Sequence, residues 1–199
     1  VIGVTQPELR RGLRCLLERR GVPSLFLDGE LRLADEGPGH FGLRSPLGDA
    51  RGLPLPLAGD HQRRNAALAA SAALWLGRRG LGIGPQHLGP GLAAVQWPGR
   101  LELRAWKGAS LLLDAAHNPG AARALAASLP TGPIHLLVGT SDPHDPGPFL
   151  DELLPRLSRL TATRAAHRGL PVTAIEDALR DRGADLPISS VPAVPAALE

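Results

Sequence analysis

The sequence predicts an α/β protein built in two parts. Its second half alternates short apolar segments with helix-forming segments, which is typical of a Rossmann-like, mostly parallel sheet. Its first half holds a helix and several short strand candidates separated by turns, which favours an antiparallel β meander. We place the domain boundary where the regular alternation begins, and expect domains at residues 1–95 and 96–199.

The first half combines two helices with short strands. One helix is expected from Pro7 to Gly21, with leucines along one stripe, and a longer one over residues 60–79. The Asp28–Gly29 pair lies between two apolar runs and predicts a β-hairpin. The strands are expected at residues 1–5, 25–27, 31–33, 41–44 and 53–57. The residues before the long helix contain too little apolar surface to form a core of their own.

The second half alternates strands with helices. Its strands are expected at residues 101–105, 109–114, 134–139, 160–163 and 186–189. Its helices are expected at residues 119–129, at 149–157 with Pro155 limiting the end, and from a capping box at Thr173–Glu176 to Gly183. Another helix is expected to begin just before Glu199.

Residues 111–120 have the pattern of a buried strand that ends at a carboxylate, turns, and starts a helix. Three leucines run into Asp114, Asn118 is a good N-cap, and Pro119 suits the first helical position. Asp114 and His117 are therefore expected at the carboxyl end of a strand, where α/β proteins bind ligands and helix N–H groups favour phosphate. On this pattern alone, a ligand site and a well-capped turn with purely structural polar residues both stay open.

Composition narrows the class of protein. The sequence contains no methionine, so we expect a piece of a longer protein or a processed one. The single Cys15 excludes an internal disulfide and fits a reducing compartment. No apolar run approaches the roughly 20 residues that cross a bilayer. We expect a cytoplasmic monomer with no membrane partner.

The positive charge is scattered arginine. The formal net charge is +3, and Lys107 is the only lysine. The arginine pairs lack the aromatic residues that a nucleic-acid stacking platform needs, and solvated helix faces explain them better. No nucleic-acid partner is expected.

Three short motifs occur in order along the chain. They are Gly59-Asp60-His61-Gln62-Arg63-Arg64-Asn65-Ala66-Ala67, Trp97-Pro98-Gly99-Arg100-Leu101-Glu102, and Asp114-Ala115-Ala116-His117-Asn118-Pro119. In order and spacing they resemble the folylpolyglutamate synthase and dihydrofolate synthase family of Mur-ligase-type amide ligases. The resemblance covers nearly the whole chain. It implies that residues 1–95 are the end of an ATP-binding domain and residues 96–199 a C-terminal domain truncated at its end.

The resemblance implies a reaction and a set of ligands. The family joins L-glutamate to a folate or dihydropteroate carboxylate through an acyl phosphate, with ATP and Mg²⁺ as cofactors. It implies that Asn65, Arg100 and Asp114 contact ATP, and that His117 lies near phosphate or the incoming glutamate. Arg100 suits phosphate, since guanidinium offers planar, charge-assisted donors. No catalytic residue other than His117 is indicated.

Each of these residues also has a structural interpretation. Asn65 fits a surface position on a helix, and Arg100 fits an ion pair with Glu102. His117 fits a helix cap or a hydrogen bond to a carbonyl group.

The sequence departs from the family pattern at several positions. Ala115 stands where glycine is common, Gly120 where histidine is frequent, and the loop at residues 141–145 lacks the family's lysine, with His144 as the alternative cation. The 199 residues contain no glycine–lysine phosphate loop and no acidic cluster for magnesium. We therefore expect this chain alone to be inactive and to bind ATP weakly or undetectably. The phosphate loop and metal ligands are expected in a missing N-terminal region.

Two other functions stay open. One is a different Mur-type amide ligase, acting on a peptidoglycan precursor or cyanophycin, although Ala115 and Asn118 favour the folate branch. The other is a non-catalytic binding module with the same fold. The sequence leaves open whether dihydropteroate, folate or both are acceptors.

Overall fold

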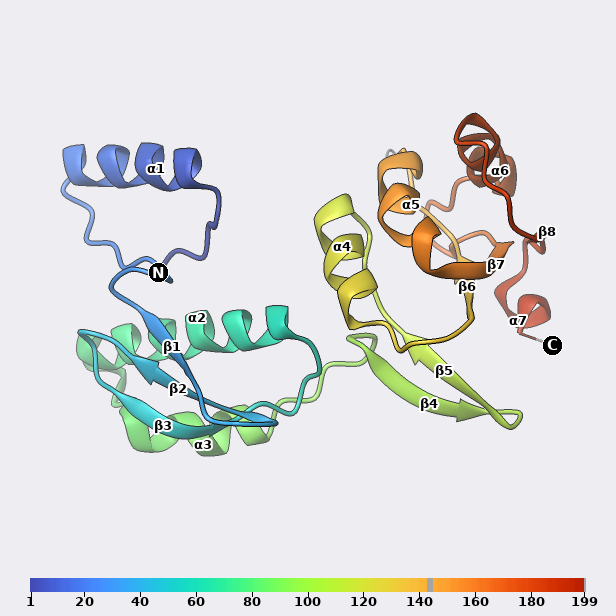
Figure 1. The fold of residues 1–199 in the computed structure, drawn as a ribbon. Coiled ribbons are helices and arrows are strands. Elements are labelled where there is room, and N and C mark those ends of the chain that lie inside the picture. Colours follow the sequence, from blue (N-terminus) through green and yellow to red (C-terminus); the bar gives the residue numbers. More distant parts are fainter. Residues whose placement is uncertain (143–144, 199) are drawn as a thin grey trace. The chain divides into compact units, whose positions relative to one another are not determined.

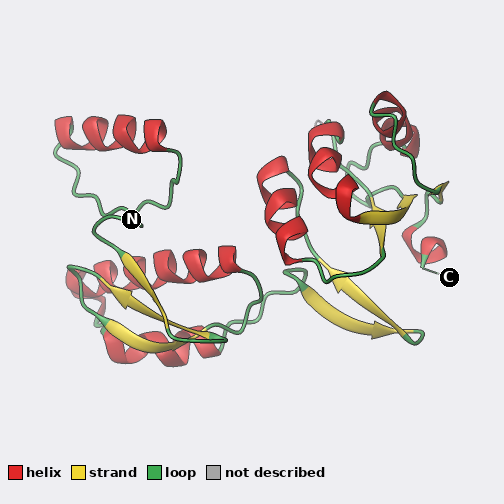
Figure 2. Cartoon of the chain, in the orientation of Figure 1, coloured by secondary structure: helices red, strands yellow, loops and turns green. Residues whose placement is uncertain are grey.

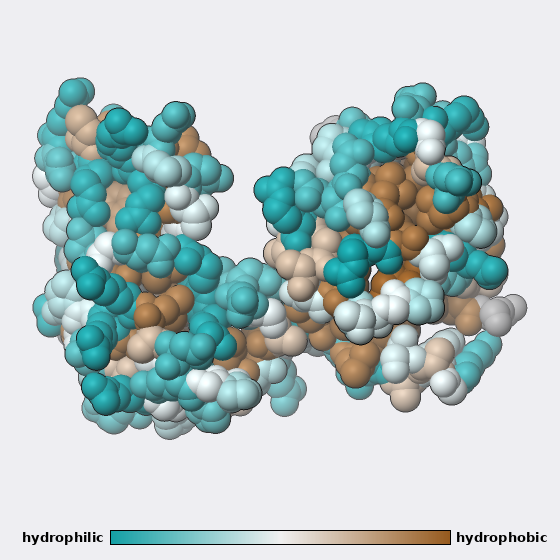
Figure 3. All heavy atoms as spheres, in the orientation of Figure 1, coloured by the Kyte–Doolittle hydropathy of each residue, from teal (hydrophilic) through white to brown (hydrophobic). Residues whose placement is uncertain are grey.

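The computed structural model describes residues 1–142 and 145–198 of the protein (Figure 1). Its contacts divide it into two compact units, Val1–Leu113 and Asp114–Glu199. Antiparallel strands characterise the first unit, whereas strands and helices alternate in the second (Figure 2). Hydrophilic and hydrophobic residues both reach the surface of each unit (Figure 3). In the described part of the chain, no helix has the length and apolarity needed to cross a membrane.

The first unit is an antiparallel meander with helices and a terminal hairpin. Its elements are α1 (Pro7–Arg19), β1 (Arg32–Asp35), β2 (His40–Arg44), β3 (Ala50–Pro54), α2 (Asp60–Leu76), η1 (Gly77–Leu81), α3 (Pro85–Ala93), β4 (Glu102–Trp106) and β5 (Ala109–Leu113). Strands β1, β2 and β3 pair antiparallel in that order. The predicted meander and long helix are therefore confirmed.

The core of the first unit lies between the meander and α2. Phe41 and Leu43 of β2 are fully buried, as is Ala67 of α2, and Leu74 is nearly so. Small alanines on α2 let the sheet approach the helix closely, which suits the interdigitated packing of protein interiors. The strands thus depend on α2 for their core, as the scarcity of apolar residues before the helix predicts.

The hairpin expected at residues 25–33 is only partly formed. The tight turn exists, with Asp28 at φ +61° and Leu31 N–H donating to Phe26 O at 3.1 Å. However, Leu27 and Leu31 make only an isolated bridge, and β1 begins one residue later and pairs with β2. The expectation of a regular hairpin was wrong, because the residues from Arg32 onward pair with β2, while Phe26 forms a bridge with Ile2.

The expectation of a doubly covered strand at residues 109–114 was also wrong. Strand β5 pairs antiparallel with β4, and its residues are exposed or half-buried. The cause is local: Lys107 and Gly108 have φ of +47° and +80°, and a two-residue turn of this kind joins antiparallel neighbours. The apolar run of β5 predicts a strand correctly but does not identify its neighbour.

The second unit contains a parallel three-stranded sheet. Its elements are α4 (Pro119–Ser128), β6 (Ile134–Val138), α5 (Gly147–Leu153), η2 (Leu154–Arg156), β7 (Leu157–Ala162), α6 (Val172–Asp181), β8 (Ile188–Ser190) and α7 (Val194–Ala197). Strands β6, β7 and β8 are parallel in that order. The predicted α/β class with a parallel C-terminal sheet is confirmed.

The capping box expected at the start of α6 is absent. The helix begins at Val172 with Pro171 as N-cap, and no side chain caps it. Thr173 lies inside the first turn, and Glu176 accepts a hydrogen bond from Ser190 Oγ instead. The prediction was wrong because Pro171 already has extended backbone geometry and its carbonyl accepts from Ala174 N–H at 3.0 Å.

Candidate functional site

Asn65 lies near the start of α2. The residue just before this helix, Gly59, has a backbone geometry that requires glycine. Gly59 is the N-cap residue with φ +96°, and a Cβ there would lie 2.8 Å from His61 Cε1 and 2.9 Å from Leu101 Cδ1. Asn65 is exposed, and its Nδ2 donates to Oε1 of the buried Gln62 at 3.2 Å. The structure therefore presents an oriented carboxamide on the surface of the helix.

Arg100 lies in the loop before β4 and is half-buried. The neighbouring Glu102 carboxylate accepts from Gly99 N–H at 2.8 Å and from Arg104 Nε at 2.7 Å. These hydrogen bonds, the one from Gly99 first, hold the pKa of Glu102 below its ordinary value. No ion pair involves Arg100 within residues 1–142 and 145–198, so the pairing with Glu102 that the sequence left open is not formed. Leu101 adopts φ +47° while buried, a strained geometry that occurs often at ligand sites.

Asp114 and His117 lie in the turn between β5 and α4. Asp114 Oδ1 accepts from Ala116 N–H at 2.8 Å, which fixes the carboxylate against the turn. His117 is exposed, and its Nδ1 lies 3.0 Å from the Ala115 carbonyl oxygen. Because a carbonyl oxygen only accepts, this hydrogen bond places a proton on Nδ1. It is also the carbonyl contact that the structural interpretation of His117 requires.

The start of α4 is capped as the sequence predicts. Asn118 is the N-cap residue, and its Oδ1 accepts from Ala121 N–H at 2.9 Å. Pro119 occupies the first helical position, where no N–H donor is needed. The cap fixes the direction in which the chain leaves the turn that carries Asp114 and His117.

The four predicted residues thus fall in both units. Asn65 and Arg100 belong to the first unit, and Asp114 and His117 belong to the second. Asn65, Asp114 and His117 each make a hydrogen bond within their own local segment. Asp114 and His117 are brought into one turn, three residues apart.

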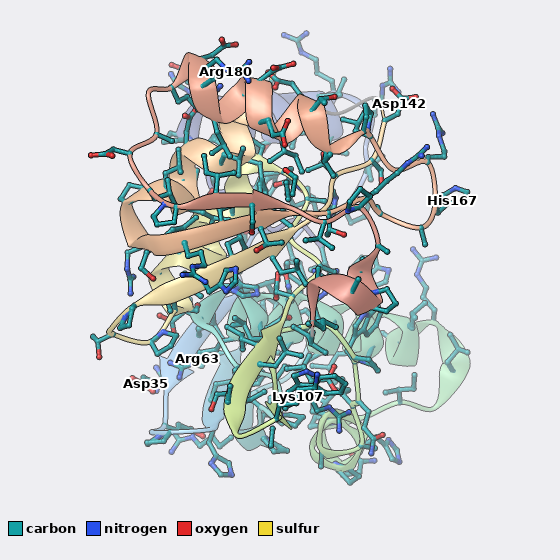
Figure 4. All side chains as sticks on the ribbon, turned by 90° about the vertical axis from the view of Figure 1, so that its right-hand side faces the viewer. Asp35, Arg63, Lys107, Asp142, His167 and Arg180 are labelled. Carbon is teal, nitrogen blue, oxygen red and sulfur yellow. The ribbon has the colours of Figure 1, made fainter. Side chains whose placement is uncertain are left out.

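The loop after β6 is joined to the loop after β7. Asp142 N–H donates to Arg168 O at 2.9 Å, and Arg168 Nη2 donates to Asp142 Oδ2 at 3.3 Å. Figure 4 shows Asp142 and His167 at this end of the unit. His144, the alternative cation of this loop, lies outside the described residues. In the described ranges, no group of three or more His, Cys, Asp or Glu residues forms a metal site.

A surface hollow of about 340 Å³ lies beside the start of α2. Arg63 there donates to Asp35 Oδ1 at 3.2 Å (Figure 4), and its Nε is buried without a hydrogen-bond partner among the described residues. None of the four predicted residues lines this hollow, and sequence reasoning missed it. The loop of Leu55–Gly59 that leads into α2 was the available signal. The lining residues are Gly39, Leu55, Pro56, Leu57, Ala58, Gly59, Asp60 and Arg63.

Comparison with known proteins identifies relatives for both units. The family described as "Mur ligase, glutamate ligase domain" matches residues 99–199. The dihydrofolate synthase/folylpolyglutamate synthase of Bacillus subtilis is 33% identical over 134 residues, covering 65% of this chain and 31% of the relative. The folylpolyglutamate synthase of Lacticaseibacillus casei is 32% identical over 135 residues, covering 66% and 30%.

A solved structure matches almost the entire chain. Mycobacterium tuberculosis folylpolyglutamate synthase, complexed with ADP and AMPPCP, aligns with a TM-score of 0.80 at 26% identity, covering 99% of this chain and 47% of that one. The chain therefore spans less than half the length of these three relatives. The chain belongs to the Mur ligase family through its glutamate ligase domain.

Proposed function

We propose that this chain forms part of an ATP-dependent ligase that adds L-glutamate to a folate or dihydropteroate carboxylate. Residues 99–199 match the glutamate ligase domain family, and the similar curated proteins are folylpolyglutamate and dihydrofolate synthases. These relatives favour the folate branch over ligases of peptidoglycan precursors or cyanophycin.

Arg100 is the residue whose environment best supports a nucleotide role. A half-buried guanidinium with its neighbouring carboxylate already bound elsewhere is positioned to meet an external anion. Arg100 would hold a phosphate group of ATP and stabilise the negative charge that develops during transfer. The proposal rests on one observation: Arg100 is half-buried, and the neighbouring Glu102 carboxylate bonds to Gly99 and Arg104.

The remaining residues have narrower roles in the proposal. Asn65 would orient the nucleotide through its carboxamide, and Asp114 would accept hydrogen bonds from ribose hydroxyls. His117 would lie near phosphate or the incoming amine. ATP supplies the phosphoryl group that activates the acceptor carboxylate. The described residues do not form a site that fits Mg²⁺, so no step is assigned through it here.

The domain assignment is part of the proposal. Residues 1–95 would belong to the ATP-binding domain and residues 96–199 to the ligase C-terminal domain. The family match from residue 99 supports this division, whereas the compact units divide at residue 113. We also propose that the ligase acts as a monomer in the cytoplasm on small-molecule substrates.

The proposal is tested with the protein expressed from its complete reading frame. Purified protein is incubated with ATP, MgCl₂, L-glutamate and either dihydropteroate or tetrahydrofolate, and products are separated by mass. We expect a product that is heavier than the acceptor by one glutamate residue. One ADP should be released for each product molecule formed. Release of ADP without any glutamate-dependent product, or no reaction with either acceptor, would contradict the proposal.

A further inference from the structure

The excess positive charge of the chain lies in its first unit. Residues 1–113 contain 15 arginines and lysines and nine acidic residues, which gives a formal charge of +6, whereas residues 114–199 carry −3. An uneven charge of this size raises the local concentration of ligands of the opposite sign. An anion that approaches the chain is therefore drawn to the first unit.

Two arginines from different elements lie against the turn at Asp28–Gly29. Arg10 of α1 donates to Leu27 O, and Arg32 Nε of β1 donates to Gly29 O at 3.3 Å. A Cβ on Gly29 would lie 3.3 Å from Arg10 Nη2, so the glycine leaves room for this guanidinium beside the turn. Each guanidinium carries five N–H donors, so one hydrogen bond holds it in place and other donors remain for a ligand.

Arg44 extends this group of cations onto the neighbouring strand. Arg32 and Arg44 are directly opposite each other in the antiparallel pairing of β1 with β2, where like charges destabilise a sheet. Phe41 and Leu43 of β2 are fully buried, so the alternation of strand side chains directs Arg44 to the opposite face, which it shares with Arg32. Both arginines are exposed. We call Arg10, Arg32 and Arg44 the Gly29 cluster.

No carboxylate of the described ranges forms an ion pair with the Gly29 cluster. The acidic side chains of the adjoining turn are engaged elsewhere, since Asp28 pairs with Arg64 at 2.8 Å and Glu30 pairs with Arg14 at 2.8 Å. The turn therefore already holds carboxylates against guanidinium groups, and the three arginines of the cluster keep their charge for an external anion.

We propose that the Gly29 cluster binds the free carboxylates of a glutamate chain on the acceptor substrate. The planar fork of guanidinium suits carboxylates, and cations spread over a helix and two strands suit several carboxylates along a chain better than one compact anion. A glutamate chain offers one free carboxylate per residue. The assignment rests on the proposed function, because a ligase that adds glutamate can meet acceptors that already carry it. None of the residues assigned to ATP belongs to the cluster.

Binding is tested by calorimetry at low ionic strength with the 199-residue chain and tetraglutamate as the probe. The Arg10→Gln/Arg32→Gln variant should bind tetraglutamate at least about 10-fold more weakly, because it loses two charge-assisted donors. The matched control Arg19→Gln/Arg51→Gln removes the same charge from exposed positions of α1 and β3 and should leave the affinity nearly unchanged. Arg44→Gln, at an exposed position, should weaken binding several-fold and tests the site even if the double variant unfolds.

The calorimetric result judges this site without any enzyme activity. No binding of tetraglutamate, or equal losses in the two double variants, would overturn the proposal. Inorganic phosphate that binds more tightly than tetraglutamate and depends on Arg10 and Arg32 would also overturn it, because the cluster would then be a phosphate site.

Kinetics of the protein expressed from its complete reading frame supply a second readout. Acceptors that carry one or four glutamates are compared in the presence of ATP, MgCl₂ and L-glutamate. Arg10→Gln/Arg32→Gln should raise KM at least about 10-fold for the longer acceptor, and leave kcat, KM for ATP and KM for the shorter acceptor nearly unchanged. Equal changes for both acceptors would overturn the proposal, whereas no glutamate addition to any acceptor would contradict the proposed function itself.

Discussion

Glu30→Gln should weaken the attachment of α1 to its unit. The Glu30 carboxylate accepts two hydrogen bonds from Arg14 and one from Phe26 N–H at 2.9 Å. The Arg14 hydrogen bond is the main cause that lowers the pKa of Glu30 from 4.5 to about 2. Glutamine keeps the shape and one acceptor oxygen but loses the charge.

The magnitude follows from the pKa and the exposure of the pair. At about 1.4 kcal/mol per pKa unit, the change from 4.5 to about 2 corresponds to roughly 3.5 kcal/mol for a fully shielded group. The Arg14 and Glu30 side chains are 40% and 32% exposed, so solvent screening reduces the expected contribution to about 1 kcal/mol.

The sign of the pH dependence is fixed by the lowered pKa. The contribution of Glu30 is fully present above pH 4.5 and is lost as the pH falls towards 2. Urea unfolding followed by circular dichroism should show Glu30→Gln about 1 kcal/mol less stable at pH 7, with the difference vanishing near pH 2. Glu8→Gln, which removes an exposed carboxylate of α1 that makes no ion pair among the described residues, is the control. A constant difference between wild type and Glu30→Gln from pH 7 to pH 2 would refute the reasoning.

Three further predictions concern caps, backbone and nucleotide. Asn118→Ala should cost about 1 kcal/mol in urea unfolding because Ala121 N–H loses its acceptor, and Asn118→Ser should restore most of it; equal stability of all three proteins would contradict this. Gly59→Ala should cost more than about 1 kcal/mol, since φ is +96° and the new Cβ meets His61 and Leu101, and an unchanged melting temperature would show that the α2 entry relaxes freely. Calorimetric titration of ATP into the 199-residue chain should give no measurable binding, because the sequence has no glycine–lysine loop for the phosphates, and micromolar affinity would contradict this.

Most elements defined by neighbouring residues were predictable from the sequence, although the capping box expected at Thr173–Glu176 is absent. The cap at Asn118–Pro119 and the long α2 each depend on residues a few positions apart. Among elements that depend on distant partners, the parallel sheet of β6, β7 and β8 was predicted correctly, but the pairing of the segment at residues 25–27 was not. Phe26 forms a parallel bridge with Ile2, because α1 returns the chain alongside its own beginning, and only one bridge, Leu27–Leu31, forms across the Asp28–Gly29 turn.

The candidate site shows the same division. The motifs predict Arg100 and Asp114 as site residues, but the sequence could not choose between a ligand role and an ion pair with Glu102 for Arg100. That choice depends on which groups the Glu102 carboxylate binds. In the structure it accepts hydrogen bonds from Gly99 and Arg104 rather than from Arg100. The hollow beside Arg63 depends on the approach of Gly39 to the 55–60 loop, a contact that no local pattern contains.

Arg100→Ala, in the protein expressed from its complete reading frame, tests the nucleotide role most directly. The change should lower kcat/KM for ATP-dependent glutamate addition by about 100-fold or more, the usual effect of removing a donor to developing negative charge, and leave the melting temperature nearly unchanged. The control Arg51→Ala removes an exposed arginine of β3 and should retain full activity. Equal activity of the two variants, or a loss of activity in Arg100→Ala that a fall in melting temperature accounts for, would contradict the role of Arg100 in holding phosphate.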